Sequence, residues 1–139
     1  MSECCSEQIS SRTFPKKYRC PANGQTYDKV GTKTLLHHIK SPWLVDLKQQ
    51  GYYFCTDPQC QVVYFGQDDS VIQVSDVKSR VGQKETKQDR PICYCFDVTQ
   101  LNAEKDASIK SFVVNKTKAA LCSCETSNPS GKCCLKDFP

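Results

Sequence analysis

The residues with the clearest chemical potential in this sequence are its cysteines. Eleven of the 139 residues are cysteine. Six of them form three close pairs in the second half of the chain, namely Cys93 and Cys95, Cys122 and Cys124, and Cys133 and Cys134. Thiolates bind soft and borderline metals or exchange disulfides. In a reducing compartment spaced cysteines more often bind metal or do redox chemistry than form structural disulfides, so we expect metal sites.

The composition agrees with a small protein that needs support from metals. Only 38% of the residues are hydrophobic, and chains with a thin core commonly add metals or disulfides. The first residues are polar and acidic, so we expect no secretory signal and a cytoplasmic location. No segment approaches the ~18 apolar residues of a membrane span. The net charge of +4 comes from scattered lysines, and we expect no nucleic-acid partner.

One group of cysteines has the spacing of a zinc knuckle. Residues 52–55 and 60–66 are rich in aromatic and β-branched side chains, which predicts a β-hairpin. The loop of this hairpin carries Cys55 and Cys60 as C-x4-C around Pro58, a spacing typical of zinc sites. Cys20 opens a tight turn that ends at Gly24 and can present a third thiolate.

A structural zinc needs a fourth ligand beyond Cys20, Cys55 and Cys60. We expect it from the N-terminal segment, at Cys5 or at Cys4, and His38 is the remaining alternative. Residues 1–13 are polar and show no periodicity, so they are expected to be a flexible tail.

The segment between Cys20 and the hairpin predicts helices. Leu35, Leu36 and Ile39 recur at helical spacing. Ser41 and Pro42 then predict the start of a second short helix, with Trp43 packed at the joint. After the hairpin, residues 70–75 predict a third strand at the edge of the same sheet.

The C-terminal third predicts short helices between cysteine-bearing loops. Thr99 is the expected N-cap of a helix that reaches about Lys105, and Ser108 is the expected cap of the next. The second helix is expected to have an apolar face made of Ile109, Phe112, Val113 and Ala120. Residues 128–131, Asn-Pro-Ser-Gly, predict a turn that folds the last cysteine pair back toward the pair before it.

These elements predict a small α+β protein that is stabilised by metal. A short antiparallel sheet with helices is expected around a zinc site, followed by a second metal region that is mostly helix and loop. The expected organisation is a zinc-binding subdomain over residues 1–75, a connecting segment over 76–91 and a second metal-binding subdomain over 92–139. We find no paired carboxylates, nucleophile triad or phosphate loop, so a conventional enzyme is not expected.

The C-terminal cysteines suit either a second zinc or a [2Fe-2S] cluster. A zinc gathers four thiolates around one atom and favours C-x2-C to C-x4-C spacings. A two-iron cluster spreads two pairs of thiolates over two atoms. The C-x-C of Cys93 and Cys95, together with a pair separated by a wide loop, favours the cluster and leaves zinc open.

Several longer motifs occur in register between about Cys20 and Cys134. They are Tyr53-Phe54-Cys55, Cys60 with Val62-Val63-Tyr64-Phe65, Lys78 with Arg80-Val81-Gly82 and Lys84-Glu85, Cys93-Tyr94-Cys95, and Cys124 with Asn128-Pro129-Ser130-Gly131 and Cys133-Cys134. Together they resemble the N-terminal domain of CopZ-type copper chaperones. The resemblance implies a mononuclear zinc and a [2Fe-2S] cluster whose region is similar to the bacterioferritin-associated ferredoxin family. By position it implies the cluster ligands Cys93, Cys95, Cys124 and Cys134, and it places Cys20, Cys55 and Cys60 among the zinc ligands.

The sequence also departs from that family. Asn23 stands where the family has a second cysteine, which is why the fourth zinc ligand is sought at Cys5 or Cys4. The family continues into a copper-binding domain with a C-x2-C motif, which this sequence does not contain, so a copper-transfer role is not carried over. Cys122 and Cys133 are left over, as idle thiols, substitute ligands or a transient copper site.

The leading functional hypothesis is an electron-transfer protein with zinc and a [2Fe-2S] cluster. It would handle copper or another soft metal and reduce Cu(II) to Cu(I). Its expected partners are a copper-binding chaperone or transporter and an electron donor that the sequence does not identify. The alternative is a non-redox metal-binding module or buffer with zinc at both sites. A third hypothesis is a redox switch built on Cys4 and Cys5 or on Cys133 and Cys134.

Overall fold

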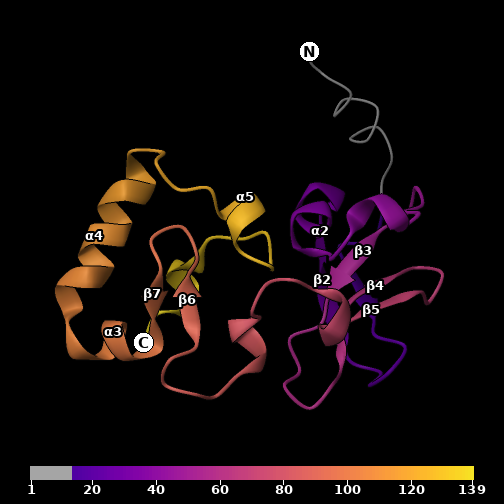
Figure 1. Ribbon diagram of the computed structural model, residues 1–139, viewed down its shortest axis with the longest axis horizontal. Coiled ribbons are helices and arrows are strands. Elements are labelled where there is room, and N and C mark those ends of the chain that lie inside the picture. Colours follow the sequence, from indigo (N-terminus) through magenta and orange to yellow (C-terminus); the bar gives the residue numbers. More distant parts are fainter. Residues whose placement is uncertain (1–13) are drawn as a thin grey trace.

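The computed structural model describes residues 14–139 and shows two lobes side by side (Figure 1). The sheet lobe comprises residues 17–78, and the C-terminal lobe comprises residues 91–138. The expected tail over residues 1–13, with Cys4 and Cys5, lies outside the described residues. Mixed helices and antiparallel strands confirm the predicted α+β class.

The sheet lobe is built on five antiparallel strands in chain order. Each strand pairs with the next one along the chain. The predicted hairpin is confirmed, with Tyr53 opposite Phe65, and the predicted third strand lies at the sheet edge. The first two strands were not predicted from the sequence. The strands are β1 (Lys17–Arg19), β2 (Thr26–Val30), β3 (Tyr52–Phe54), β4 (Val62–Gly66) and β5 (Val71–Gln73).

Strand β3 separates two apolar clusters because successive side chains of a strand point to opposite faces. On one face Tyr52 and Phe54 pack with Leu35 and Ile39. On the other face Tyr53 packs with Phe65 and the cysteines that precede and follow the strands. The rings of Tyr53 and Phe65 stack with their centroids 5.5 Å apart, and this aromatic layer supports the cysteine side of the sheet.

The first predicted helix is present, and the second is not. Helix α2 spans Thr32–His38, and Leu35 is fully buried. After it the chain forms only a 3₁₀ turn, η1 (Pro42–Leu44). Ser41 has a φ of 47° and makes no side-chain cap, and Trp43 is 80% exposed instead of packed. A left-handed residue before Pro42 turns the chain away from the core, so Trp43 and Leu44 are exposed, and Leu47 further along packs on the first apolar cluster.

The C-terminal lobe contains a short hairpin, two helices in succession and a cysteine-rich end. Thr99 caps the first helix as predicted, since its Oγ1 accepts a hydrogen bond from the Asn102 amide. The elements are β6 (Pro91–Cys93), β7 (Val98–Thr99), α3 (Gln100–Lys105), α4 (Ala107–Lys118), α5 (Cys124–Ser127) and the 3₁₀ turn η4 (Cys134–Asp137).

The predicted cap and face of helix α4 need correction. The helix is capped by Asp106, not Ser108, because the Asp106 carboxylate accepts a hydrogen bond from the Ser108 amide at 3.0 Å. Val113 is buried in the lobe's core, but Phe112 is 48% exposed. Ala120 lies beyond the helix with a φ of 60°. The apolar face is therefore narrower than predicted.

The longest helix of the described part is α4, with 12 residues. It carries three lysines and is mostly polar on its outer side. Among residues 14–139 there is no helix with the length and apolar character that a bilayer crossing requires.

The predicted turn at residues 128–131 is confirmed and joins the two lobes. The Gly131 amide donates to the Asn128 carbonyl at 2.8 Å, and Gly131 has a φ of 72°. A Cβ at Gly131 would lie 2.8 Å from Thr34 Oγ1, so the turn packs closely on α2. The buried Tyr64 hydroxyl of β4 donates to the Pro129 carbonyl at 2.5 Å.

Two more polar contacts bind the lobes together. Thr34 Oγ1 donates to the Glu125 carbonyl at 2.6 Å, which links α2 with α5. The Lys132 ammonium lies 2.7 Å from the Asp28 carboxylate of β2. The hydrogen bond from Lys132, followed by that from Lys17, lowers the pKa of Asp28 to about 2. These contacts place the last cysteine pair against the sheet lobe.

Replacing Tyr64 by Phe is expected to destabilise the folded protein by about 1–3 kcal/mol, because the buried Pro129 carbonyl loses its donor. Urea unfolding followed by circular dichroism measures the free energy. Tyr18→Phe is the control, since its hydroxyl makes a longer, 3.3 Å bond in a half-buried place. Equal losses in the two variants would show that the Tyr64 hydroxyl does not hold the lobes together.

Candidate metal centres

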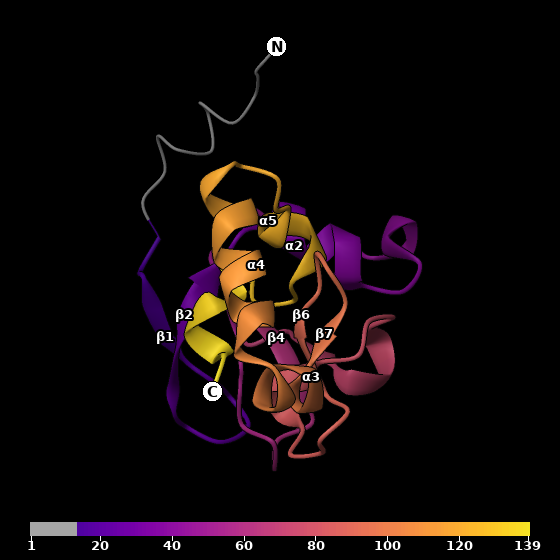
Figure 2. The same ribbon diagram turned by 90° about the vertical axis from the view of Figure 1, so that its left-hand side faces the viewer.

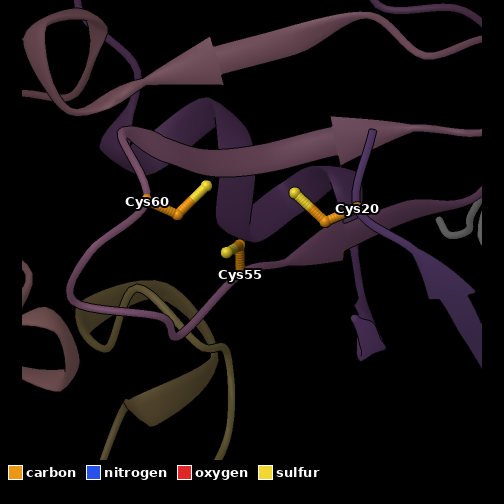
Figure 3. Close-up of side chains that lie close together, drawn as sticks. All are labelled: Cys20, Cys55 and Cys60. Carbon is orange, nitrogen blue, oxygen red and sulfur yellow. The ribbon is translucent and has the colours of Figure 1, made fainter. Parts of the chain in front are cut away.

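Three buried cysteines converge on one face of the sheet. The sulfurs of Cys20, Cys55 and Cys60 all lie within 4.8 Å of one another. Figure 3 shows the three side chains directed toward a common centre. Cys20 and Cys55 are fully buried, and Cys60 is 8% exposed. The structure therefore brings together the three residues that the sequence predicted for the first metal site.

Local backbone structure positions each of the three sulfurs. Cys20 follows β1, and its carbonyl accepts a hydrogen bond from the Gly24 amide, which closes the predicted turn. Cys55 follows β3, and its amide donates to the Val63 carbonyl of the partner strand. The Cys60 amide donates to the Asp57 carbonyl within the loop between the strands. A hairpin loop and a facing turn thus form one pocket for a cation.

The chemistry of this site fits zinc. With a Zn–S bond of about 2.3 Å, the sulfurs of a tetrahedral site lie about 3.8 Å apart. The three sulfurs here lie within 4.8 Å of one another, so small side-chain movements would bring them to that spacing. Among the described residues His38 is not part of this group, and its Nδ1 lies 2.6 Å from Ser79 Oγ instead. Cys5 and Cys4, the other predicted fourth ligands, lie outside the described residues.

Hydrogen-bond donors surround the Cys55 sulfur. Asn23 Nδ2 lies 3.5 Å from it and Lys84 Nζ lies 3.7 Å from it. Lys84 also donates to the carbonyls of Asp57 at 2.8 Å and Cys60 at 3.0 Å, so its ammonium is held in place. Burial raises the pKa of the Cys60 thiol to about 11. Positive charge nearby, from Lys84 and from a metal, favours the thiolate form that binds zinc.

The four cysteines of the second predicted site approach one another in two pairs. The sulfurs of Cys95 and Cys124 are 3.7 Å apart. Cys93 and Cys134 lie in one buried cluster, and their interaction lowers the pKa of Cys93 to about 6 and raises that of Cys134. Within residues 14–139 no three of these sulfurs lie within 4.8 Å of one another. Two separate pairs suit two metal atoms better than one tetrahedral zinc.

Backbone amides point at the sulfurs of this second group. The Ser123 amide donates to Cys95 Sγ at 3.1 Å. The backbone at Phe96 and Cys95 also favours the Cys93 thiolate and contributes to its lowered pKa. Such N–H donors stabilise thiolates and raise the reduction potential of an iron–sulfur centre.

Cys122 and Cys133 lie beside this group without joining a pair. Cys122 is half-buried and sits two residues before Cys124. Cys133 is exposed and precedes Cys134. Their accessibility leaves open the roles that the sequence allowed.

Residues 80–84 connect the two cysteine groups physically. The hydroxyl of Tyr94, which lies between Cys93 and Cys95, accepts from the Gly82 amide at 2.8 Å and donates to the Arg80 carbonyl at 2.5 Å. Gly82 packs so closely on Pro91 that a Cβ would lie 2.1 Å from the Pro91 carbonyl oxygen. Gly82 begins the 3₁₀ turn η3 (Gly82–Lys84), whose last residue reaches the Cys55 sulfur.

Sequence reasoning assigned no role to Lys84, Tyr94 or Asn23 at these sites. Lys84 lies in a polar segment, where a lysine is usually solvated. The only available signal was that Lys84 and Tyr94 belong to the motifs quoted for the family resemblance.

Residues 17–78 match the CopZ family described as a zinc binding domain. The chain also resembles the X-ray structure of the Archaeoglobus fulgidus CopZ N-terminal domain, with a TM-score of 0.66 and 32% identity. That likeness covers 88% of this chain and 99% of the solved one. The chain belongs to the family of CopZ N-terminal domains. The zinc-binding part of the predicted resemblance is thereby confirmed, and the [2Fe-2S] part stays a prediction.

The full-length relative is the copper chaperone CopZ of Archaeoglobus fulgidus. Identity is 33% over 120 residues, which is 84% of this chain and 57% of that protein. The chain thus spans little more than half the length of the curated CopZ. The CopZ zinc-binding domain match includes Cys20, Cys55 and Cys60 but ends before the second cysteine group.

Replacing Lys84 by Met is expected to weaken zinc binding about 10- to 100-fold, because the neighbouring ammonium no longer stabilises the Cys55 thiolate. Competition with a chromophoric chelator measures the affinity. Lys87→Met, in the same segment but exposed, is the matched control and should bind zinc as the wild type does. An affinity of Lys84→Met equal to that of the control would rule out this role.

Proposed function

We propose that this chain is an electron-transfer protein with zinc and a [2Fe-2S] cluster that takes part in the handling of copper or another soft metal. Its chemistry would include the reduction of Cu(II) to the Cu(I) that thiolates prefer. Membership of the CopZ family supports the link to metals, since the relative is named a copper chaperone. The chain matches just over half of that relative, so the copper role is part of the proposal.

The observation that carries the proposal is the arrangement of four cysteine sulfurs in two pairs. We assign Cys95 and Cys124 to one iron, in keeping with their 3.7 Å separation, and Cys93 and Cys134 to the other. A [2Fe-2S] cluster supplies a one-electron redox couple when it is bound. A single zinc would need all four sulfurs about 3.8 Å apart, and their arrangement fits that requirement poorly.

The surrounding residues have the properties that such a centre needs. Cys93, Cys124 and Cys134 are buried, which keeps water from most of the site. The Ser123 amide on Cys95 Sγ adds a hydrogen bond that raises the potential. Cys95 is half-buried, so that side of the site is the one from which electrons can leave.

Copper is the substrate in this proposal, and two thiols are available to receive it. Cys122 and Cys133 are the accessible cysteines beside the four proposed ligands. Thiolates hold Cu(I) more favourably than oxygen donors do, so reduced copper would stay near them. A copper-binding chaperone or transporter is the proposed recipient, and the cytoplasm is the proposed location.

Zinc has a structural role in this proposal. The sheet lobe buries three thiols next to its aromatic layer. The proposed zinc subdomain ends near residue 75. Zinc at Cys20, Cys55 and Cys60, completed by Cys5 or Cys4, would add its binding free energy to folding. Residues 76–91 would connect it to the cluster subdomain over 92–139.

The protein purified without oxygen is expected to be coloured and to contain about one zinc and two iron atoms per chain. On reduction it should give the EPR signal of a [2Fe-2S] centre. A colourless protein with two zinc atoms, even after reconstitution with iron and sulfide, would instead establish the non-redox metal-binding module.

Ser variants test the assignment of ligands. Cys124→Ser should abolish the EPR signal, because Cys124 is paired with Cys95. Cys122→Ser, two residues away and outside the pairs, is the control that should keep it. Loss of the signal in both variants, or in neither, would contradict the assignment.

A further inference from the structure

Helix α4 carries lysines as its only charged side chains. Between Ala107 and Cys124 the sequence has three lysines and no acidic residue. Lys110 and Lys118 are exposed, and Lys116 is half-buried. Figure 2 shows α4 facing the viewer at the end of the molecule, away from the sheet. Helix α4 and the residues up to Leu121 are called the α4 face below.

Two large apolar side chains are exposed on the same face. Phe112 is 48% exposed and Leu121 is 62% exposed. The Lys116 ammonium lies 5.2 Å from the centroid of the Phe112 ring, so charge and apolar surface are adjacent. The Leu121 amide donates to the Lys116 carbonyl, which fixes the end of the helix. Exposed apolar and charged side chains thus lie next to each other on this face, as they do at docking surfaces.

The α4 face is in direct contact with the second cysteine group. The rings of Phe112 and Phe96 meet edge to face, with centroids 5.5 Å apart. Phe96 directly follows Cys95 in the chain and packs against the buried cluster that contains Cys93. Leu121 precedes Cys122 in the chain. A protein seated on this face would therefore bring its own redox centre close to these cysteines.

We propose that the α4 face is the docking surface for an acidic one-electron donor protein. This inference rests on the proposed function, because it names the partner of the same site. The donor loses one electron and the iron–sulfur site gains it, so no proton or further reactant is required. The three lysines of α4 attract an acidic surface to this end of the molecule, and this attraction speeds encounter more than it tightens the complex.

A protein partner fits this face better than a lipid surface. An interfacial helix needs a broad apolar side opposite its basic residues. Helix α4 already buries Val113 and half-buries Ile109 in the lobe's core, which leaves Phe112 as its one large exposed apolar side chain. A single exposed ring with one lysine beside it, on a helix with two further lysines, suits a transient redox encounter instead.

The first test measures binding to flavodoxin, an acidic flavin protein, by titration calorimetry at low and high salt. A variant with Lys110, Lys116 and Lys118 all replaced by Gln should bind at least about tenfold more weakly at low salt, and the difference should shrink at high salt. Gln is used instead of Glu because a carboxylate near the C-terminal end of a helix would destabilise the helix. Replacement of Lys16, Lys40 and Lys78, exposed on the sheet lobe, is the control and should leave binding unchanged.

The second test follows electron transfer from fully reduced flavodoxin by the appearance of its semiquinone in a stopped-flow spectrometer. The α4-face variant should react at least about tenfold more slowly than the control variant. Dithionite should reduce both at the same rate. No reduction by dithionite would defeat the proposed function itself, whereas equal rates with flavodoxin would defeat only the docking surface.

A sedimentation assay with vesicles of phosphatidylcholine and phosphatidylserine separates the two kinds of partner. Wild-type protein should remain in the supernatant. Binding to these vesicles that is lost in the α4-face variant would overturn the proposal, because it would assign the lysines to a lipid surface.

Discussion

The burial of thiols that must carry negative charge is the constraint on which the rest of this structure depends. Cys20, Cys55 and Cys60 lie beneath an aromatic layer where water does not reach them. Burial disfavours thiolates, as the raised pKa of Cys60 shows. A bound cation reverses that preference, so the sheet and its metal are expected to fold as one unit. The strands, the turn at Cys20 and the hairpin loop are arranged to satisfy this requirement.

The two cysteine groups are not independent of each other. Lys84 reaches the Cys55 sulfur, and two residues earlier Gly82 hydrogen bonds to Tyr94 between Cys93 and Cys95. A short, closely packed 3₁₀ turn therefore contacts both groups. The hydrogen bond from Tyr64 to Pro129 joins the lobes at a second place and limits how far they can move apart.

The departure of this chain at Asn23 has a clear consequence in the structure. Asn23 Nδ2 contacts Cys55 Sγ at 3.5 Å and Asp57 Oδ2 at 3.1 Å, and its Oδ1 accepts from the Gln25 amide. An amide in this position can donate to a thiolate but is a poor ligand for zinc. Asn23 thus contacts one of the three converging thiols and links the Cys20 turn to the hairpin loop.

The sequence by itself determined the local features of this protein. The hairpin with Cys55 and Cys60 in its loop, the Thr99 cap and the turn at 128–131 follow from propensity and spacing over a few residues. The approach of Cys20 to these two cysteines depends on the pairing of distant strands. Only the tertiary structure decided that β1 and β2 join the sheet, that no helix follows Pro42, and that Cys95 meets Cys124. It also decided that the Lys84 ammonium contacts the sulfur of Cys55, which lies 29 residues earlier in the chain. These outcomes depend on contacts between distant segments, and no local pattern encodes which of those contacts will be the most favourable.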